Sequence, residues 1–506
     1  MCGILGIMGN KQVSQEIFDG LTVLQHRGQD SAGIMTYEDH FHLKKGNGLA
    51  RDVFHTKNMV RLRGNMGIGH VRYPTAGSYD AAEAQPFFVN SPFGIALIHN
   101  GNLTNYEQLK SEVLKIDLRY LNTKSDSELL LNVVAQAIRD TLRSKQVKTF
   151  SITPEVIFEA MDTVFKRLKG SYSVIAIIAG YGLMAFRDPY GIRPLSFGMR
   201  KTEILPEYIF ASESVTLDTL GYDLVSDVQP GEVVFIDTKR EVHRKQVTKK
   251  HWAPCIFEHV YIARPDSMQD GVSVYKTRLR MGVKLAQKIK DAKLKIDVVV
   301  PVPDSARSSA LALAQELGIK YREGLVKNRY IGRTFIMPGQ AIRQKSIHYK
   351  LNPIKLEIEG RNILLVDDSI VRGNTSKKII EMIREAGANK VYFASAAPPI
   401  ISPCVYGVDM PSKKEFVAHE LNVDEICKVI GADKLFYQEI DDLIDSAKEG
   451  NPKITNFCYA CMSGKYPTPE VTKELLAKAE ASRGTVHEID SEFGADGIKD
   501  DQLTLI

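Results

Sequence analysis

The chain has 506 residues, of which 44% are hydrophobic and 25% are charged, a composition typical of folded globular proteins. This length predicts roughly two to four domains. The net charge of +5 is too small to indicate a nucleic-acid partner or a membrane surface. Six cysteines in a chain without a signal-peptide pattern predict a reducing compartment and a cytoplasmic location.

Short apolar runs with glycine turns characterise the first half of the chain. The longest run, residues 172–186, is too short to cross a bilayer, and Gly180 and Gly182 interrupt it, so it predicts a β-hairpin. Helical patterns occupy residues 127–142 and 154–168. This mixture predicts sheets packed with helices, in an α+β or layered arrangement. Further strands are predicted at residues 4–9, 94–99 and 232–236.

The second half has a different pattern, which begins after a polar, basic stretch at residues 237–253. Apolar runs at residues 296–300 and 362–366 are each followed by a helical pattern, and a third run covers residues 391–397. Buried strands linked by helices predict a parallel α/β sheet. We therefore predict three units: residues 2–235, residues 255–470, and residues 471–506 with a C-terminal helix and an acidic tail.

Cys2 is the most informative residue of the first unit. Removal of Met1 would leave a thiol and a free α-amino group on one residue. A thiolate is a strong nucleophile, and an α-amino group, which titrates near pH ~8, can serve as its base. The Asn100 amide and the Gly101 backbone N–H could stabilise an oxyanion. The alternatives are a small residue that begins a strand and an Asn-Gly tight turn.

Two arginines and one acid could complete a pocket for an amino acid. The planar guanidinium of Arg72 suits a carboxylate, and Asp126 suits an ammonium group. Arg27 lies in an early loop, directly before Gly28. The alternative for each arginine is a surface ion pair, and the alternative for Asp126 is a helix N-cap.

In their order and spacing, these segments resemble the N-terminal-nucleophile glutamine amidotransferases. The resemblance covers residues 2–235 and implies an αββα four-layer sandwich. It also implies that Cys2 attacks the amide carbon of glutamine, so that ammonia leaves and water then releases glutamate. The other implied roles are oxyanion stabilisation by Asn100 and Gly101 and glutamine binding by Arg27, Arg72 and Asp126.

Residues 363–376, ILLVDDSIVRGNTS, form the sharpest motif of the second half. An apolar strand ends in Asp367 and Asp368, and a loop with Gly373 leads to Thr375 at the start of a helix. Ligands bind at the carboxyl ends of such strands, and a helix start attracts phosphate. Adjacent acids suit ribose hydroxyls or Mg²⁺. The alternative is a strand, a turn and a capped helix without a ligand.

This motif resembles the phosphoribosylpyrophosphate (PRPP) signature of type I phosphoribosyltransferases. The loop at residues 300–307 is placed to meet pyrophosphate, and the basic segment 327–345 suits a mobile flap or, alternatively, a solvated loop. The resemblance implies Mg²⁺ binding by Ser305, Asp367 and Asp368. The implied PRPP-binding residues are Asp367, Asp368, Ser369, Arg372, Gly373, Asn374, Thr375, Ser376, Lys327 and Arg333.

Both halves in one chain, with residues 258–267 between them, resemble the glutamine PRPP amidotransferases. The resemblance implies that ammonia from glutamine displaces pyrophosphate from PRPP, which gives 5-phosphoribosylamine in the first step of de novo purine synthesis. It implies a pentosyl-class glycosyltransferase, a homodimer or homotetramer, and inhibition by purine nucleotides, with no nucleic-acid or membrane partner. The alternatives are a non-catalytic PRPP-sensing regulator and a glutaminase that feeds another acceptor.

Four further cysteines form a separate candidate site. Cys458 and Cys461 form a CxxC pair, and soft thiolate sets suit Fe–S clusters or Zn²⁺. Together with Cys255 and Cys404 they resemble the ligands of a structural [4Fe–4S] cluster in one branch of the family. Cys2 directly after Met1 instead resembles the branch without a cluster. Buried free thiols are the alternative.

Overall fold

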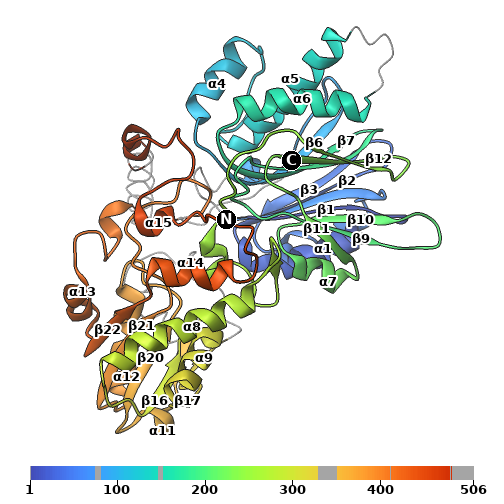
Figure 1. The fold of residues 1–506 in the computed structure, drawn as a ribbon. Coiled ribbons are helices and arrows are strands. Elements are labelled where there is room, and N and C mark those ends of the chain that lie inside the picture. Colours follow the sequence, from blue (N-terminus) through green and yellow to red (C-terminus); the bar gives the residue numbers. More distant parts are fainter. Residues whose placement is uncertain are drawn as a thin grey trace, which may run out of the picture.

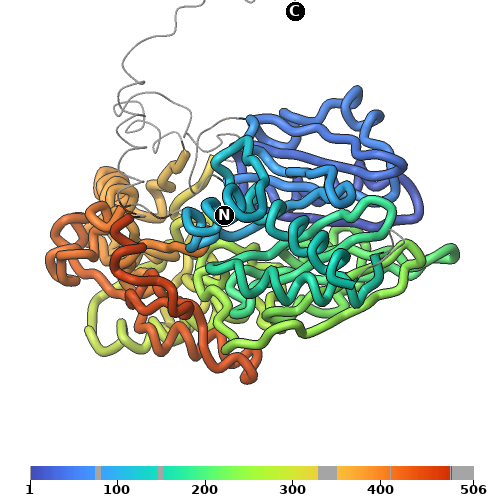
Figure 2. The backbone as a smooth tube through the Cα atoms, turned by 90° about the horizontal axis from the view of Figure 1, so that it is seen from above, coloured from blue at the N-terminus to red at the C-terminus, as the bar shows by residue number. Residues whose placement is uncertain are grey.

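The computed structural model describes residues 2–73, 81–145, 152–328, 350–408, 410, 412–478 and 480. Arg333, most of the basic segment 327–345 and the predicted acidic tail lie outside these residues. The chain forms two halves, a larger β-rich half and a smaller α/β half (Figure 1). Seen from above, the second half packs along one side of the first (Figure 2).

The first half contains two stacked antiparallel sheets with helices on both outer faces (Figure 1). One sheet has the order β11 (Asp223–Asp227), β9 (Ser196–Arg200), β10 (Glu207–Ala211), β1 (Cys2–Met8), β4 (Met66–Arg72), β2 (Ser31–Tyr37) and β3 (Phe41–Asn47). The other has the order β13 (Val242–Gln246), β12 (Glu232–Asp237), β8 (Gly182–Arg187), β7 (Gly170–Ile178), β6 (Ile95–Leu103) and β5 (Phe87–Val89).

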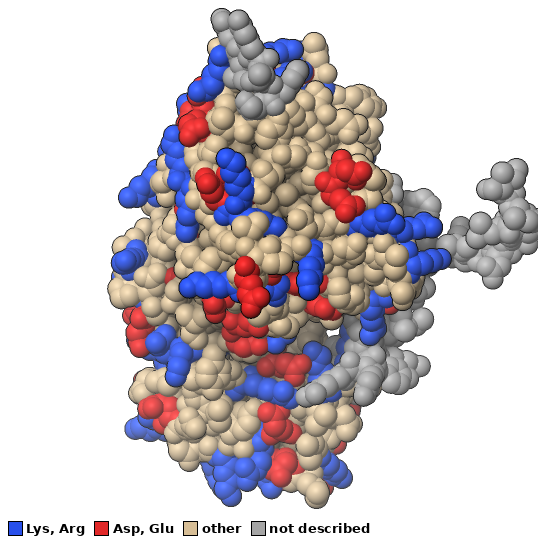
Figure 3. Space-filling view, turned by 90° about the vertical axis from the view of Figure 1, so that its right-hand side faces the viewer, with Lys and Arg blue, Asp and Glu red and all other residues tan. Residues whose placement is uncertain are grey.

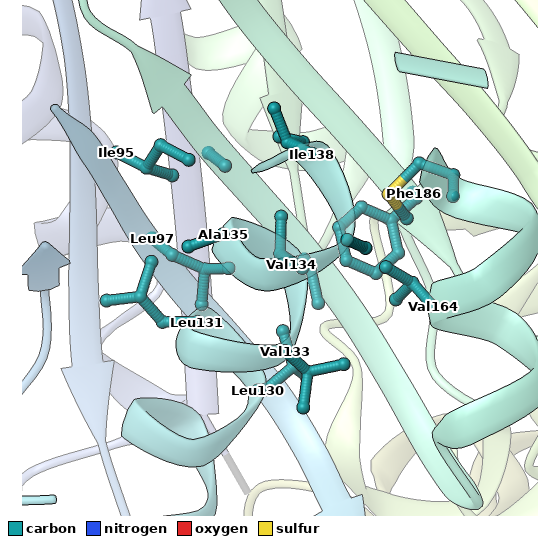
Figure 4. Close-up of a cluster of buried hydrophobic side chains, with 14 of the residues drawn as sticks. Ile95, Leu97, Leu130, Leu131, Val133, Val134, Ala135, Ile138, Val164 and Phe186 are labelled. Atoms are coloured by element: carbon teal, nitrogen blue, oxygen red, sulfur yellow. The ribbon is translucent and has the colours of Figure 1, made fainter. Parts of the chain in front are cut away.

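Three apolar cores hold these layers together. The outer helices are α1 (Ser14–Val23) and α7 (Ser214–Leu220) on one side and α4 (Tyr106–Lys115), α5 (Asp126–Ser144) and α6 (Pro154–Arg167) on the other. One core joins the two sheets, and one lies under the helices of each side. In Figure 4, Leu131 and Ala135 of α5 face Ile95 and Leu97 of β6. The predicted αββα four-layer sandwich is confirmed.

The second half contains a parallel sheet with the strand order β17 (Lys320–Tyr321), β16 (Val298–Pro301), β20 (Asn362–Asp367), β21 (Lys390–Ser395) and β22 (Lys434–Tyr437). Helices α8 (Val274–Asp291) and α9 (Arg307–Leu317) cover one face, and α12 (Asn374–Glu385) and α13 (Val423–Ile430) cover the other. Every residue of β20 is buried, because helices cover both faces of the sheet. This explains the nearly continuous apolar run in its sequence. The predicted parallel sheet is confirmed.

Shorter elements connect these layers. They are α2 (Ala50–Val53), α3 (Thr56–Met59), α11 (Lys355–Ile358), α14 (Ile440–Lys448), α15 (Ala460–Ser463), and the paired strands β14 (Met268–Gln269) with β15 (Val272–Ser273) and β18 (Leu325–Lys327) with β19 (Leu351–Pro353). Strand β13 continues the first half to Gln246, beyond the predicted end at residue 235. Among the described helices, none is long and apolar enough to cross a membrane. Figure 3 shows acidic and basic side chains interspersed on one face.

A buried ion pair fastens the two halves together. Arg187 at the end of β8 donates from both terminal nitrogens to Asp270, at 2.6 Å and 2.8 Å. Asp270 lies in the turn between β14 and β15, and both side chains are almost completely buried. Burial and the charge of Asp270 raise the pKa of the neighbouring Asp227 to about 7. The Arg187 guanidinium therefore balances the negative charge of Asp270 and its neighbour Asp227.

We expect Arg187→Met to destabilise the protein strongly, because it leaves buried carboxyl groups without their cation. Removal of one partner of a buried pair costs about 3–5 kcal/mol of unfolding free energy, so the Tm should fall by several degrees. The matched control is Arg264→Met, which removes an exposed partner of Asp266 and should change the Tm little. Equal melting temperatures of the two variants would contradict a stabilising role for the buried pair between Arg187 and Asp270.

Candidate active sites

Cys2 lies at the start of β1, between the two sheets of the first half. Its Cα is paired with that of Arg72 in the β1–β4 ladder. Its backbone nitrogen donates to Asn100 Oδ1 of β6 at 3.3 Å, and its Sγ lies 4.0 Å from the Tyr73 carbonyl oxygen. The fold therefore brings the predicted nucleophile next to two of its predicted partners.

Asn100 presents a hydrogen-bond donor that lacks a partner. The residue is completely buried, and its Nδ2 makes no hydrogen bond with any of the described residues. A buried donor left unpaired costs about 1–3 kcal/mol, which indicates a ligand that accepts from it. The alternative interpretation of Asn100 and Gly101 as a tight turn is wrong. These residues pair with Ser173 and Tyr172 inside the β6–β7 ladder.

Gly101 occupies a position where a side chain cannot fit. Its φ is +155°, and an added Cβ would lie 2.1 Å from the Ser171 carbonyl oxygen and 2.8 Å from His99 Nε2. Both neighbours are fixed, since Ser171 belongs to β7 and burial keeps His99 enclosed. A glycine at this position therefore allows β6, next to Asn100, to approach β7 closely.

Arg72 and Asp126 lie at the edge of the same site. Arg72 Nη2 donates to the buried Glu83 at 2.9 Å, which orients the guanidinium. Asp126 Oδ2 accepts from the Leu103 backbone nitrogen at 3.1 Å, so it is tied to the end of β6. The N-cap alternative for Asp126 is wrong, because Ser125 caps α5. Both side chains remain partly exposed.

Arg27 is enclosed by two carboxylates from distant segments. It donates from Nε to Glu213 and from Nη2 to Glu258 at 2.5 Å, and all three side chains are buried. Burial would raise the pKa of Glu213, but the charges of Arg27 and His26 outweigh it and hold this pKa well below its ordinary value. The surface ion pair considered for Arg27 is therefore wrong, and the guanidinium is engaged inside the protein.

A second site lies at the carboxyl ends of β16 and β20. These strands are adjacent, with Pro301 opposite Val366, so the loops that follow them meet. Ser305 Oγ donates to Asp368 Oδ2, and Ser369 Oγ donates to Asp368 Oδ1 at 2.6 Å. Burial, followed by the charge of Asp368, raises the pKa of Asp367 well above its ordinary value. A buried pair of acids favours a cation beside it.

Helix α12 begins at Asn374, after a five-residue loop that follows these acids. Gly373 has φ +77° at the N-cap position, and no side chain caps the first turn. Asn374 and Thr375 are exposed there, whereas Ser376 is buried. Uncapped N–H groups and the positive end of the helix dipole favour a phosphate group at this place.

The basic residues predicted for this site are held by carboxylates. Arg372 Nε donates to Glu415 at 2.8 Å, and Lys327 Nζ donates to Asp304 at 3.1 Å. These pairs are largely exposed, so they are weak and can exchange for a phosphate. Arg333 lies outside the described residues.

The four cysteines of the third candidate site gather in one buried apolar cluster. Cys255 and Cys458 form a β-bridge, and the backbone nitrogens of Ile401 and Ser402 both donate to the Cys461 carbonyl oxygen. The four are Cys255, Cys404, Cys458 and Cys461. All four are buried and none forms a disulfide bond with a described residue, and burial raises the pKa values of Cys255, Cys458 and Cys461.

The buried guanidinium of Arg193 lies beside these thiols. Its Nη1 contacts Glu258 at 3.3 Å, but its Nε and Nη2 have no hydrogen-bond partner among the described residues. Burial would lower the pKa of Arg193, but the neighbouring Cys255, Glu258, Cys404 and Cys458 outweigh it and raise this pKa. Unpaired donors next to sulfur suit thiolates or a group bound by them.

Comparisons with known proteins agree with this geometry. Residues 72–219 match the glutamine amidotransferase domain, and residues 277–432 match the phosphoribosyl transferase domain. The amidophosphoribosyltransferases of Pseudomonas aeruginosa and Escherichia coli are 56% and 52% identical, over 96% and 94% of both chains. The B. subtilis glutamine PRPP amidotransferase complexed with ADP and GMP is 35% identical, with a TM-score of 0.80 over 93% of this chain and 98% of that chain.

The fold and its two sites define a glutamine amidotransferase joined to a phosphoribosyltransferase. The extent of the identity shows more: the chain belongs to the amidophosphoribosyltransferase family. It is a glutamine-dependent pentosyltransferase and not the non-catalytic regulator considered above.

The sequence reasoning missed the acids that hold Arg27 and the role of Arg193. Glu213 and Glu258 contact Arg27 across 186 and 231 residues, and no local pattern marks such a pair. Only Glu258 had a signal, because it opens the family-like segment 258–267.

Proposed function

We propose that the first half hydrolyses glutamine at Cys2 and that the second half transfers the released ammonia to C1 of PRPP. The products are glutamate, 5-phosphoribosylamine and pyrophosphate, in the first step of purine synthesis. The observation that carries this proposal is the buried, unpartnered Asn100 Nδ2 beside Cys2. The glutaminase of another acceptor system would lack the second site at Asp367 and Asp368.

In the glutaminase half, the Cys2 thiolate attacks the amide carbon, and the carbonyl oxygen becomes an oxyanion. Asn100 Nδ2 and the Gly101 N–H stabilise this charge. When the C–N bond breaks, ammonia leaves with the proton taken from the thiol, and a thioester remains. Water then attacks the thioester, which releases glutamate and restores Cys2.

The amino-acid end of glutamine needs one cationic and one anionic partner. Arg72 offers a guanidinium to the α-carboxylate, and Asp126 offers a carboxylate to the α-ammonium group. We assign Arg27 an indirect role, because its donors already form ion pairs with Glu213 and Glu258. It therefore supports the pocket without a direct contact to glutamine.

In the transferase half, ammonia attacks C1 of ribose and pyrophosphate leaves through a transition state that resembles an oxocarbenium ion. Asp367 and Asp368 bind the ribose hydroxyls, or together with Ser305 they would hold Mg²⁺. When bound, Mg²⁺ would supply positive charge for the leaving pyrophosphate. The start of α12, from Gly373 to Ser376, binds the ribose phosphate, with Ser369 beside it. Lys327, Arg333 and Arg372 supply positive charge for the phosphates.

The four cysteines fit a [4Fe–4S] cluster as ligands. Arg193 supports this assignment, since its unpaired Nε and Nη2 suit an anionic group held by the sulfur atoms. When bound, such a group supplies a structural cross-link between Cys255, Cys404 and the CxxC pair. Purine nucleotides as inhibitors, a homodimer or homotetramer, and a cytoplasmic location rest on family membership; the B. subtilis relative is complexed with ADP and GMP.

We expect Cys2→Ala to lower glutamine-dependent synthesis by about 10³-fold or more, because the nucleophile is gone. Synthesis from added ammonium salt should remain, since the PRPP site is separate. The measurement is pyrophosphate release with each nitrogen source, with Cys427→Ala as the matched control. Loss of both activities, or full activity of protein whose mass retains Met1, would contradict the role of Cys2.

Asp367→Asn and Asp368→Asn should each lower transfer by about 100-fold or more with either nitrogen source, because each removes a charge beside ribose and pyrophosphate. Asp297→Asn is the matched control: this acid accepts from the Asn362 nitrogen at the opposite end of β20. Glutaminase activity of all three variants is measured in parallel. Normal PRPP turnover in both site variants would refute the site.

Anaerobically purified protein should contain iron and sulfide and be brown. Cys458→Ser should lose most of the iron, whereas Cys427→Ser should keep it, since Cys427 packs in a different apolar cluster. The measurements are metal analysis for iron and zinc, sulfide determination and the visible spectrum. Stoichiometric zinc would show that the cysteines bind zinc instead of an iron–sulfur cluster. Titratable thiols without any metal would show that they bind neither.

A further inference from the structure

A short segment of the second half packs directly on the strands of the oxyanion site. Residues 404–407 leave the cysteine cluster and lie against the ends of β6 and β7. Asn102 Nδ2 of β6 donates to the Val405 carbonyl oxygen at 3.0 Å, and Ser171 Oγ of β7 donates to the Tyr406 carbonyl oxygen at 2.8 Å. Asn102 and Ser171 are paired across the two strands. The segment is therefore hydrogen-bonded to both strands at the same level of the sheet.

Gly407 continues the segment and contacts Gly101 through the backbone alone. Its φ is +93°, and an added Cβ would lie 2.8 Å from both the carbonyl carbon and the carbonyl oxygen of Gly101. These are backbone atoms, so rotation of a side chain cannot relieve the contact. Gly101 cannot retreat toward β7, because its own close approach to Ser171 leaves no space there.

We propose that Gly407 is a positioning residue for glutamine hydrolysis, which holds Gly101 and the adjacent Asn100 amide in the geometry that stabilises the oxyanion. The inference rests on the proposed role of these two residues. An oxyanion hole acts on the transition state, and small displacements of its donors lower the rate more than substrate binding. Arg72 lies on β4, away from this contact, so it can still bind the substrate.

The test compares Gly407→Ala with Gly431→Ala. Both glycines belong to the second half and have similar φ angles, +93° and +78°, but an added Cβ at Gly431 meets no atom within 4 Å. The two variants thus share the backbone strain and differ in the contact with Gly101. Gly431 follows α13 and lies outside both proposed sites.

For Gly407→Ala we expect the kcat of glutamine hydrolysis to fall about 10- to 100-fold, with KM within about twofold. Ammonia-dependent transfer should stay within about twofold of the parent. An aldehyde analogue of glutamine, which forms a tetrahedral adduct with Cys2, should bind more weakly by the same factor as kcat, whereas glutamate inhibition should not change. Gly431→Ala should leave all five quantities near those of the parent.

A second variant tests the same contact without adding an atom. Asn102→Ala removes the hydrogen bond to Val405 and should lower the same kcat a few-fold. The proposal is overturned if Gly407→Ala and Gly431→Ala have equal kcat values, or if both Gly407→Ala and Asn102→Ala raise KM and leave kcat unchanged. A failure of the proposed glutaminase function would look different. In that case the Cys2→Ala variant would still hydrolyse glutamine.

Discussion

The structure depends on one buried carboxylate, that of Glu258, which two arginines share. Arg27 reaches it from the short helical turn Gln25–Arg27, and Arg193 reaches it from beside the cysteines. Glu213 neutralises the remaining charge on Arg27. Removal of any one of these groups would leave another charge buried without a partner, which is far more costly than loss of an exposed pair. The pocket, the cysteine cluster and the junction of the halves are therefore fixed by the same few charges.

The two sites use different electrostatics for different chemistry. At Cys2 the fold offers an uncharged donor, the buried amide of Asn100, which suits a charge that would exist only briefly in the proposed reaction. At Asp367 and Asp368 the fold places two acids in a buried position that raises their pKa values. That arrangement is unfavourable alone and becomes favourable when a cation and a polyphosphate complete it. The proposed first site thus uses neutral groups, whereas the proposed second site concentrates negative charge.

Local patterns in the sequence predicted most of the fold, and long-range contacts explain the rest. The apolar run that became β20 and the hairpin of β7 and β8 have periodicities that identify them within a few residues. Strand β22 was missed, since its four residues carry too little pattern. Cys2, Asn100 and Asp367 were predicted as site residues from their chemistry and their motifs, and the fold places Cys2 beside Asn100. Arg27 was predicted to bind glutamine. The sequence does not reveal that Glu213 and Glu258, which lie far along the chain, form ion pairs with it.

The backbone contact between Gly101 and Gly407 joins the two halves of the chain directly. Side chains between two segments rotate and absorb small shifts, whereas two backbones in direct contact transmit them. Tyr406 also donates from its backbone nitrogen to Cys404 Sγ at 3.4 Å, and its hydroxyl is hydrogen-bonded to Thr468 Oγ1 at 2.7 Å. Residues 404–407 are thus bonded to Thr468 and to strands β6 and β7 at the same time. A shift of this segment would reach Gly101 through the contact of the two glycines, and with it the adjacent Asn100 amide beside Cys2.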